Sequence, residues 1–202
     1  MLRLNAEKRI ILASSSPYRK ELLSRLQLPF EIVVPDIDES PLPNESPEAT
    51  ALRLAEQKAL SIAKNKQNVI VIGSDQVATL DGLQIGKPGN HPNALAQLQM
   101  MRGKRVIFHS ALCVYQNYLA SPSIQINNVQ TMVTFRDLPD AQLDAYLRIE
   151  QPYDCAGSAK NEGLGIALLE CIESTDPTAL TGLPLIALTD MLLKIGVVFF
   201  RN

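Results

Sequence analysis

Asp75 is the side chain whose setting first suggests chemistry. The apolar, β-branched run Val69–Ile72 predicts a buried strand, which we expect to end on Gly73, Ser74 and Asp75. The carboxyl end of a core strand is the usual place for active-site residues in α/β proteins. Lys87 follows after a short polar excursion that could fold back beside this acid. An acid and a cation together suggest metal-assisted or phosphate chemistry; an aspartate that only caps a turn is the alternative.

A serine run, Ser14–Ser16, predicts a second polar feature. Ser16 suits the N-cap of a helix and Pro17 its first position. The free N–H groups and positive dipole end of such a helix bind anions. Arg19, one turn into the helix, could grip phosphate oxygens bidentately. Simple capping beside a surface arginine is the alternative interpretation.

An acidic, proline-punctuated loop supplies Asp36, Asp38 and Glu39. Carboxylates are hard oxygen ligands for Mg²⁺ or Mn²⁺, which phosphate enzymes hold with one or two acids plus substrate oxygens. A loop that is merely solvated is the alternative. Lys58 lies on a helix that begins at Pro47 and otherwise looks core-facing. This lysine either extends to the surface or points into a cleft.

The elements that must position these residues alternate along the chain, which predicts an α/β fold with a mixed β-sheet flanked by helices. Strands are expected over 9–13, 30–34, 69–75, 106–115, 124–135 and 166–169, and a hairpin of 77–80 with 83–85 around the turn dipeptide Asp81–Gly82. Helices are expected from residue 17, from residue 47, and over 91–101, 139–148 and 183–195. A long glycine-bearing loop is expected over 151–165.

Composition narrows the class of protein. With 202 residues, 46% hydrophobic and 20% charged, the chain fits a single domain over 1–202 with a real core. A net charge of −2 argues against a surface that coats a nucleic-acid polymer. No segment approaches the roughly 20 apolar residues that span a bilayer, so we expect no membrane partner. Three widely spaced cysteines indicate reduced cytosolic thiols rather than disulfides or a zinc site.

Five motifs occur in one order along the chain. They are Leu12–Leu23 (LASSSPYRKELL), Asp38–Glu39, Arg53–Ala59 (RLAEQKA), Gly73–Gln76 (GSDQ) and Gly86–Pro88 (GKP). Each motif is weak alone, but together they closely resemble the Maf family of nucleotide pyrophosphatases. The resemblance continues through Ala156–Ser158 and Gly182–Leu185 and so covers nearly the whole chain.

The resemblance implies hydrolysis of a nucleoside triphosphate between the α and β phosphates, which gives a monophosphate and pyrophosphate. It also implies a divalent metal (Mg²⁺, Mn²⁺ or Co²⁺), a cytoplasmic homodimer, and an elongated fold with a central cleft, similar to inosine-triphosphate pyrophosphatases. By motif match, Asp75 is the general base or the metal ligand that positions water, and Glu39 helps to hold the metal. The residues implied in phosphate binding are Ser14, Arg19, Lys58 and Lys87.

Three further positions concern the base. Tyr18 could stack on a purine, Gln76 could hydrogen-bond a ring edge, and Glu162 could accept from the N1–H and 2-amino groups of guanine. An aromatic ring beside an acid also suits N7-methylated guanine, whose ring is cationic. This trio resembles the subfamily acting on 7-methyl-GTP, whereas the dTTP/UTP subfamily has Arg, Thr and Gln at these positions. The aromatic residue is often Trp in the 7-methyl-GTP subfamily, and this chain contains no Trp.

The leading hypothesis is therefore a metal-dependent 7-methyl-GTP pyrophosphatase. A pyrophosphatase for dTTP/UTP or another modified nucleotide is the first alternative, and Gln76 and Glu162 count against dTTP/UTP. A nucleotide-binding regulator of cell division with little catalysis is the alternative of another class. The intact set of Asp75, Glu39, Lys58 and Lys87 argues against the regulator.

Overall fold

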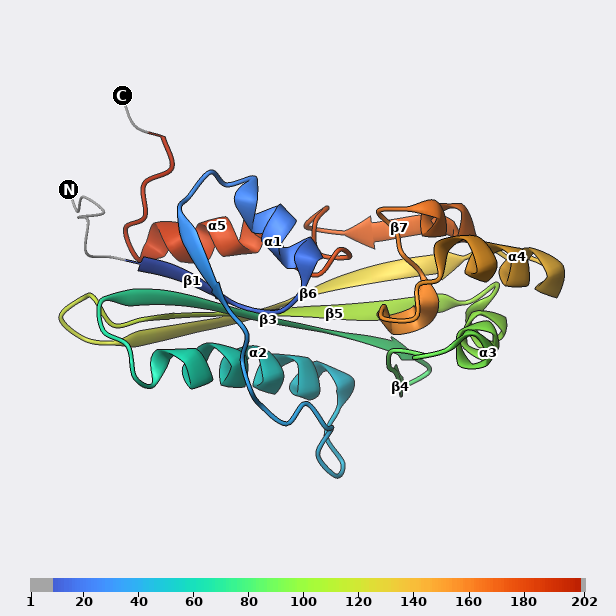
Figure 1. Cartoon of the computed structure of the whole chain (residues 1–202), viewed down its shortest axis with the longest axis horizontal. Helices are drawn as coiled ribbons and strands as arrows, with labels where there is room; N and C mark the ends of the chain where they lie inside the picture. Colours follow the sequence, from blue (N-terminus) through green and yellow to red (C-terminus); the bar gives the residue numbers. More distant parts are fainter. Residues whose placement is uncertain (1–8, 201–202) are drawn as a thin grey trace.

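The computed structural model describes residues 9–200. In this part of the chain the helices pack around a single mixed sheet (Figure 1). The strands are β1 (Arg9–Ala13), β2 (Phe30–Val33), β3 (Val69–Leu80), β4 (Leu83–Ile85), β5 (Arg105–Gln116), β6 (Ser123–Phe135) and β7 (Leu169–Ser174). The helices are α1 (Pro17–Ser24), α2 (Pro47–Ala63), α3 (His91–Met101), α4 (Asp140–Glu150) and α5 (Leu185–Lys194). The strand order is β2-β1-β3-β5-β6-β7, and β4 pairs with the end of β3. The expected mixed-sheet α/β fold is confirmed, and it is elongated along the long strands.

β3 is the strand at which the sheet changes from parallel to antiparallel pairing. It runs parallel to β1 only as far as the pair Ala13 and Gly73, but it pairs antiparallel with β5 from Ile70 to Thr79. The prediction that this strand ends at Asp75 is therefore wrong, because β5 continues to satisfy its backbone hydrogen bonds. Asp75 still lies just beyond the end of β1, where the neighbouring strand has stopped.

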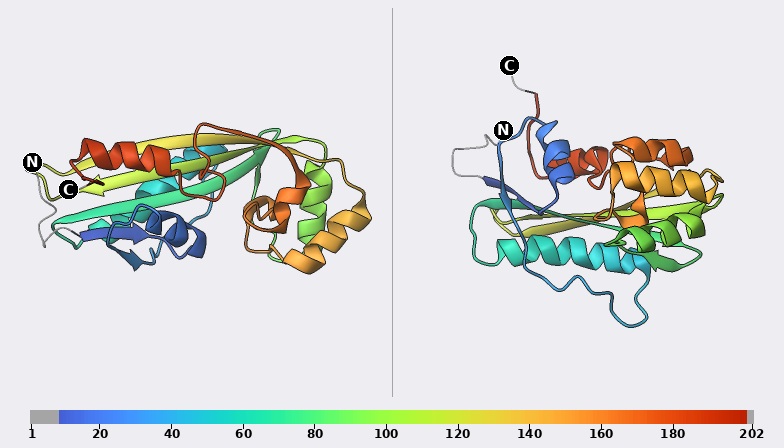
Figure 2. Two further views of the ribbon diagram at one scale, coloured as in Figure 1. Left: turned by 90° about the horizontal axis from the view of Figure 1, so that it is seen from above. Right: turned by 45° about the vertical axis from the view of Figure 1, so that its right-hand side comes forward.

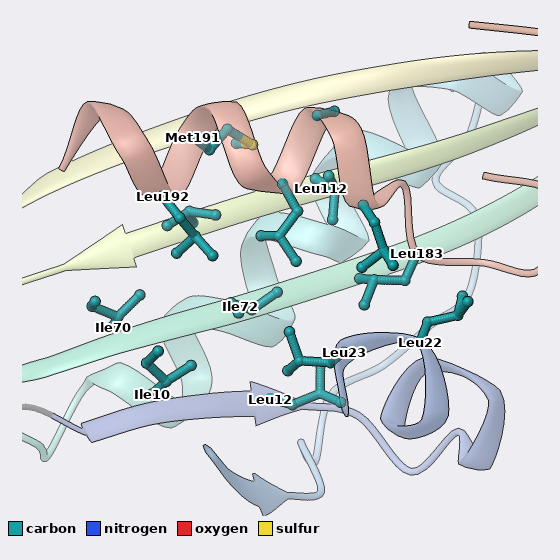
Figure 3. Packing of buried hydrophobic residues seen from close by; sticks show 14 of the residues in the cluster. Ile10, Leu12, Leu22, Leu23, Ile70, Ile72, Leu112, Leu183, Met191 and Leu192 are labelled. Atoms are coloured by element: carbon teal, nitrogen blue, oxygen red, sulfur yellow. The ribbon is translucent and has the colours of Figure 1, made fainter. Parts of the chain in front are cut away.

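Helices cover both faces of this part of the sheet. α1 and α5 lie on one face and α2 on the other (Figure 1). Figure 3 shows the first core, in which side chains of β1 and β3 meet leucines of α1 and α5; it includes Ile10, Leu12, Ile70, Ile72, Leu22, Leu23 and Leu192. The opposite core packs the alternate strand residues against a small-residue face of α2, including Ile11, Val71, Ala51, Ala55 and Ala59. α3 and α4 close a third core at the other end of the molecule (Figure 2).

Local sequence signals explain most element boundaries. The Ser16 hydroxyl caps α1 by accepting from Arg19 N at 3.3 Å, and Ser46 caps α2 by accepting from Ala49 N at 3.2 Å. Asp81 and Gly82 both have positive φ in the β3–β4 hairpin, which confirms that turn. The described helices include none long and apolar enough to cross a membrane.

The strand expected over 166–169 is wrong. Residues Leu164–Leu168 form a 3₁₀ turn, and the chain extends only from Leu169, as β7. The cause is a tight turn in which Gly165 packs on the backbone of Lys160, where a Cβ would lie 2.5 Å from Lys160 N. The loop expected over 151–165 likewise contains a short 3₁₀ turn at Ala156–Ser158.

Candidate active site

A cleft of about 490 Å³ opens beside Asp75. The residues to which the family resemblance assigns a catalytic or binding role all line it: Ser14, Tyr18, Arg19, Glu39, Lys58, Asp75, Gln76, Lys87 and Glu162. A larger, more open hollow of about 870 Å³ near the end of α2 contains none of them. We therefore take the smaller cleft as the candidate active site, because chemical groups converge there.

Lys58 joins two carboxylates at the centre of the cleft. Its Nζ lies 2.6 Å from Asp75 Oδ1 and 2.9 Å from Glu39 Oε1. The side chains of Lys58 and Asp75 are only 6% and 9% exposed, whereas that of Glu39 is 53% exposed. Lys58 thus points into the cleft instead of extending to the surface. Desolvation raises the pKa of Glu39, but the hydrogen bond and charge of Lys58, with Lys87 and Arg19, outweigh it and leave that pKa lowered.

Gly73 sets the distance between α2 and β3. A Cβ at this position would lie 2.1 Å from Ala55 O and 2.8 Å from Ala59 N, both backbone atoms of the helix. Only a glycine admits the helix this closely, and the approach brings Lys58 over Asp75, two residues along the strand. The sequence marked Gly73 only as the end of a strand, so this positioning role was missed.

Arg19 and Ser14 belong to the start of α1. Desolvation lowers the pKa of Arg19, opposed by the charges of Asp75 and Glu39. Its Nε donates to Gly182 O at 2.9 Å, which holds the guanidinium at the cleft wall. Ser14 Oγ accepts from Ser16 N at 3.0 Å, so the hydroxyl hydrogen is the part of this group that can donate to a bound anion.

The turn over residues 179–182 is fastened to the catalytic strand. Ser74 Oγ donates to Gly182 O at 3.0 Å, and Gln76 Nε2 donates to Ala179 O at 3.0 Å and to Leu180 O at 2.9 Å. Because two carbonyls accept from Gln76, its amide nitrogen must face the turn and its oxygen is the atom free to meet a base. The sequence did not reveal this anchoring, since the partners are about 100 residues apart.

Tyr18 and Glu162 both line the cleft, and the Glu162 carboxylate acts electrostatically on Tyr18. Glu162 is exposed to solvent, yet partial desolvation by its loop raises the pKa of its carboxyl group. Asp154 also lines the cleft and acts electrostatically on Tyr18. Lys160 Nζ is 5.9 Å from the Tyr18 ring centroid, and it pairs with Glu150 at 3.0 Å. Lys160 does not line the cleft, but its charge acts on Tyr18 along with those of Asp154 and Glu162, and its own ion pair with Glu150 compensates that charge.

The other nucleophile candidates take no part in this arrangement. Cys155 lines the cleft, but burial raises the pKa of its thiol to about 12, so the reactive thiolate is absent at neutral pH. His91 bonds to Asp144 at 2.8 Å, away from the cleft.

Asp75 and Glu39 are the carboxylates at the centre of the cleft that would supply oxygen ligands to a hard divalent cation. Over residues 9–200 no group of three or more His, Cys, Asp or Glu side chains is placed to hold a metal by itself. Asp75 and Glu39 nevertheless converge on one cation, the Lys58 ammonium. Two carboxylates completed by substrate oxygens are a common Mg²⁺ site, whereas an all-protein cage is not required. Asp38 instead accepts from Ser40 N at 2.9 Å, and neither it nor Asp36 lines the cleft.

The fold and cleft define an α/β protein that gathers cations and carboxylates in one cleft. Residues 9–195 match the family described as Maf-like protein, and the chain belongs to this family. A 7-methyl-GTP pyrophosphatase of Ralstonia nicotianae is 67% identical over 183 residues, which is 91% of this chain and 93% of that protein. A 7-methyl-GTP pyrophosphatase of Paraburkholderia xenovorans is 64% identical over 96% of this chain and 95% of that protein.

A solved structure supports the fold alone. The Ham1 protein from Coxiella burnetii aligns with a TM-score of 0.52 over 93% of this chain and 99% of that protein, at 13% identity. At so low an identity, the similarity extends to the arrangement of the sheet and helices and not to the chemistry of the cleft.

Proposed function

We propose that this chain hydrolyses 7-methyl-GTP to 7-methyl-GMP and pyrophosphate. The observation that carries the proposal is that one cleft holds both a group of cations and an aromatic ring with further carboxylates. The lining cations Arg19, Lys58 and Lys87 lie with the central carboxylates, whereas Asp154 and Glu162 act on Tyr18 together with Lys160, whose charge is paired with Glu150. A nucleotide with a polyanionic tail and a cationic base matches both parts. The names of the relatives at 64–67% identity support the same substrate.

The phosphate groups meet three kinds of donor in this proposal. The hydroxyl of Ser14 donates to the anion, and the start of α1 contributes its positive dipole end and the N–H of Tyr18, since Pro17 has no N–H and that of Arg19 donates to Ser16. The guanidinium of Arg19 and the ammonium of Lys87 neutralise the phosphate charge. These contacts hold the chain of phosphates so that the α–β linkage faces Asp75, which reduces the entropy that the reaction must lose.

Asp75 orients the attacking water. Its carboxylate is fixed by β3 and by Lys58, so it can accept a hydrogen bond from water without rearranging. We propose that Asp75 and Glu39 also hold a divalent cation, with phosphate oxygens as its remaining ligands. Such a cation, when bound, neutralises developing charge and acidifies a coordinated water. Whether Asp75 takes the proton or only places the water, its carboxylate is indispensable.

The base is recognised by Tyr18 and Glu162. The ring of Tyr18 stacks on the purine, and a ring with positive charge stacks more strongly than a neutral one. Glu162 accepts from the N1–H and 2-amino groups, and the oxygen of Gln76 faces the ring edge. On the strength of the family resemblance, we also propose that the protein is a cytoplasmic homodimer.

The test is product analysis with purified native protein and Asp75→Asn. Each is incubated with 7-methyl-GTP and Mg²⁺, Mn²⁺ or Co²⁺, and released pyrophosphate and monophosphate are measured. We expect equimolar products from the native protein and almost none from the variant. Unchanged pyrophosphate release by Asp75→Asn would contradict the catalytic assignment. Release of inorganic phosphate instead of pyrophosphate would contradict cleavage at the α–β linkage.

A further inference from the structure

The segment that carries Glu39 is attached to the protein by polar contacts and not by the hydrophobic core. Glu39 lies in the segment 34–46, between β2 and α2, which contains no strand or helix. Of the segment's apolar side chains, Val34 and Leu42 are exposed and Ile37 is half-buried, and none of the three belongs to the hydrophobic core clusters. Glu39 itself contacts the protein through Lys58, and its side chain is largely in solvent. Polar contacts must therefore fix the segment.

Arg53 supplies those contacts from α2. Its Nε lies 2.6 Å from Glu45 Oε1, and its Nη2 lies 2.7 Å from Glu45 Oε2, a bidentate pair. The same Nη2 donates to Ser40 O at 3.0 Å, immediately after Glu39. Arg53 thus binds both the middle and the end of the segment to the helix that carries Lys58.

Glu45 completes the fastening. Its Oε2 also accepts from Leu42 N at 3.1 Å and from Thr50 Oγ1 at 2.9 Å. The side chains of Arg53 and Glu45 are 18% and 10% exposed, unlike the solvated ion pairs elsewhere on the surface. The hydrogen bond from Arg53 lowers the pKa of Glu45 to about 2, so the pair stays ionised across the useful pH range.

We propose that Arg53 and Glu45 are a positioning pair that holds the carboxylate of Glu39 opposite Asp75. Neither residue lines the cleft, and both act through the segment that carries Glu39. Lys58 and Arg53 both lie on α2. This one helix therefore contacts the Glu39 carboxylate through Lys58 and holds the next residue, Ser40, through Arg53. The inference rests on the proposed function for the role of Glu39, although the positioning itself can be measured without any substrate.

The test substitution is Arg53→Lys, which keeps the charge but cannot form the bidentate pair. Glu45→Gln breaks the same pair from the other side and serves if the arginine variant folds poorly. The matched control is Arg105→Lys, because Arg105 pairs with Glu173 in solvent and neither residue lines the cleft. Hydrogen exchange of the amides over 36–42 is measured first, without nucleotide or metal. We expect these amides to exchange faster in both test variants than in the native protein. In the control they should exchange at the native rate.

Two further measurements connect the segment to Glu39. The Mn²⁺ concentration for half-maximal pyrophosphate release should rise about 10–100-fold in Arg53→Lys, as when residues supporting a metal ligand are lost. The KM for the nucleotide should stay unchanged, since Ser14 and Arg19 are untouched. In a Glu39→Gln background, Arg53→Lys should add nothing, because the two substitutions remove the same interaction.

The outcomes separate this inference from the proposed function. Unchanged exchange over 36–42, or an unchanged Mn²⁺ requirement in an active Arg53→Lys protein, overturns the inference. A full additional loss in the Glu39→Gln background also overturns it, since Arg53 would then act elsewhere. If native protein releases no pyrophosphate from any nucleotide, the proposed function fails while the exchange measurement still decides the positioning.

Discussion

Substituting Gly73 by Ala should separate Lys58 from Asp75 without altering either residue. The new Cβ would lie 2.1 Å from Ala55 O, whereas carbon and carbonyl oxygen approach only to about 3.3 Å. α2 must therefore retreat by about 1 Å. The atoms it meets are backbone atoms, so no side-chain rotation relieves the contact. Overpacking of this kind costs about 1–3 kcal/mol.

Two assays follow the consequence of Gly73→Ala. The midpoint temperature of thermal unfolding should fall by about 2–12 °C, because a loss of 1 kcal/mol of stability lowers it by about 2–4 °C in a chain of this size. The kcat/KM for 7-methyl-GTP should fall about 100-fold, since a displacement of about 1 Å in an active site costs that much.

Gly82→Ala is the matched control for this prediction. Gly82 has φ +82° with nothing within 4 Å of a built Cβ, and it lies outside the cleft. Alanine there should cost about 1–2 kcal/mol of backbone strain and leave kcat/KM unchanged. If Gly73→Ala also kept its kcat/KM, close approach of α2 would not position Lys58, and the reasoning would be refuted.

The remaining predictions concern charge in the cleft. Lys58→Met leaves the Asp75 carboxylate buried without its cation, and we expect a loss of about 3–5 kcal/mol in urea unfolding together with loss of activity. Asp75→Asn should destabilise the fold less than Lys58→Met does, because Lys58 keeps Glu39 as a partner; equal losses would argue that Glu39 does not hold the ammonium. The raised pKa of Glu162 predicts that the preference for 7-methyl-GTP over GTP declines as pH falls through that value, at a higher pH than for an ordinary glutamate. Glu162→Gln should lower the preference for 7-methyl-GTP over GTP and remove its pH dependence in this range. The measurement is a pH profile of kcat/KM for both nucleotides, and a pH dependence that persists in Glu162→Gln would contradict the prediction.

The fold was predictable where local chemistry decides the structure. Ser16, Ser46 and Pro17 mark helix starts through capping and a preset φ, and Asp81–Gly82 marks a hairpin through its positive φ values. These signals act within a few residues, so the sequence displays them directly.

The errors occurred where distant partners decide the structure. β3 continues past Asp75 because β5, more than 30 residues later, pairs with it. The extended chain begins only at Leu169 because Gly165 packs on Lys160. Neither partner can be read from the local pattern of hydrophobic residues.

The site shows the same division. The family resemblance identified nine residues that all line one cleft, but not the atoms that hold them. The contact of Gly73 with α2 and the binding of the 179–182 turn by Ser74 and Gln76 depend on geometry across the sheet. A sequence records which side chains are available, whereas their mutual positions follow from tertiary packing.

The most direct test of the account is the ratio of kcat/KM values for 7-methyl-GTP, GTP, dTTP and UTP with one native preparation. The carboxylates beside Tyr18 predict that 7-methyl-GTP is the best of the four and that GTP follows it. Equal or faster turnover of dTTP and UTP would contradict the account, because these pyrimidines carry no positive charge and offer a single ring N–H in place of the adjacent N1–H and 2-amino donors from which Glu162 accepts in the proposal.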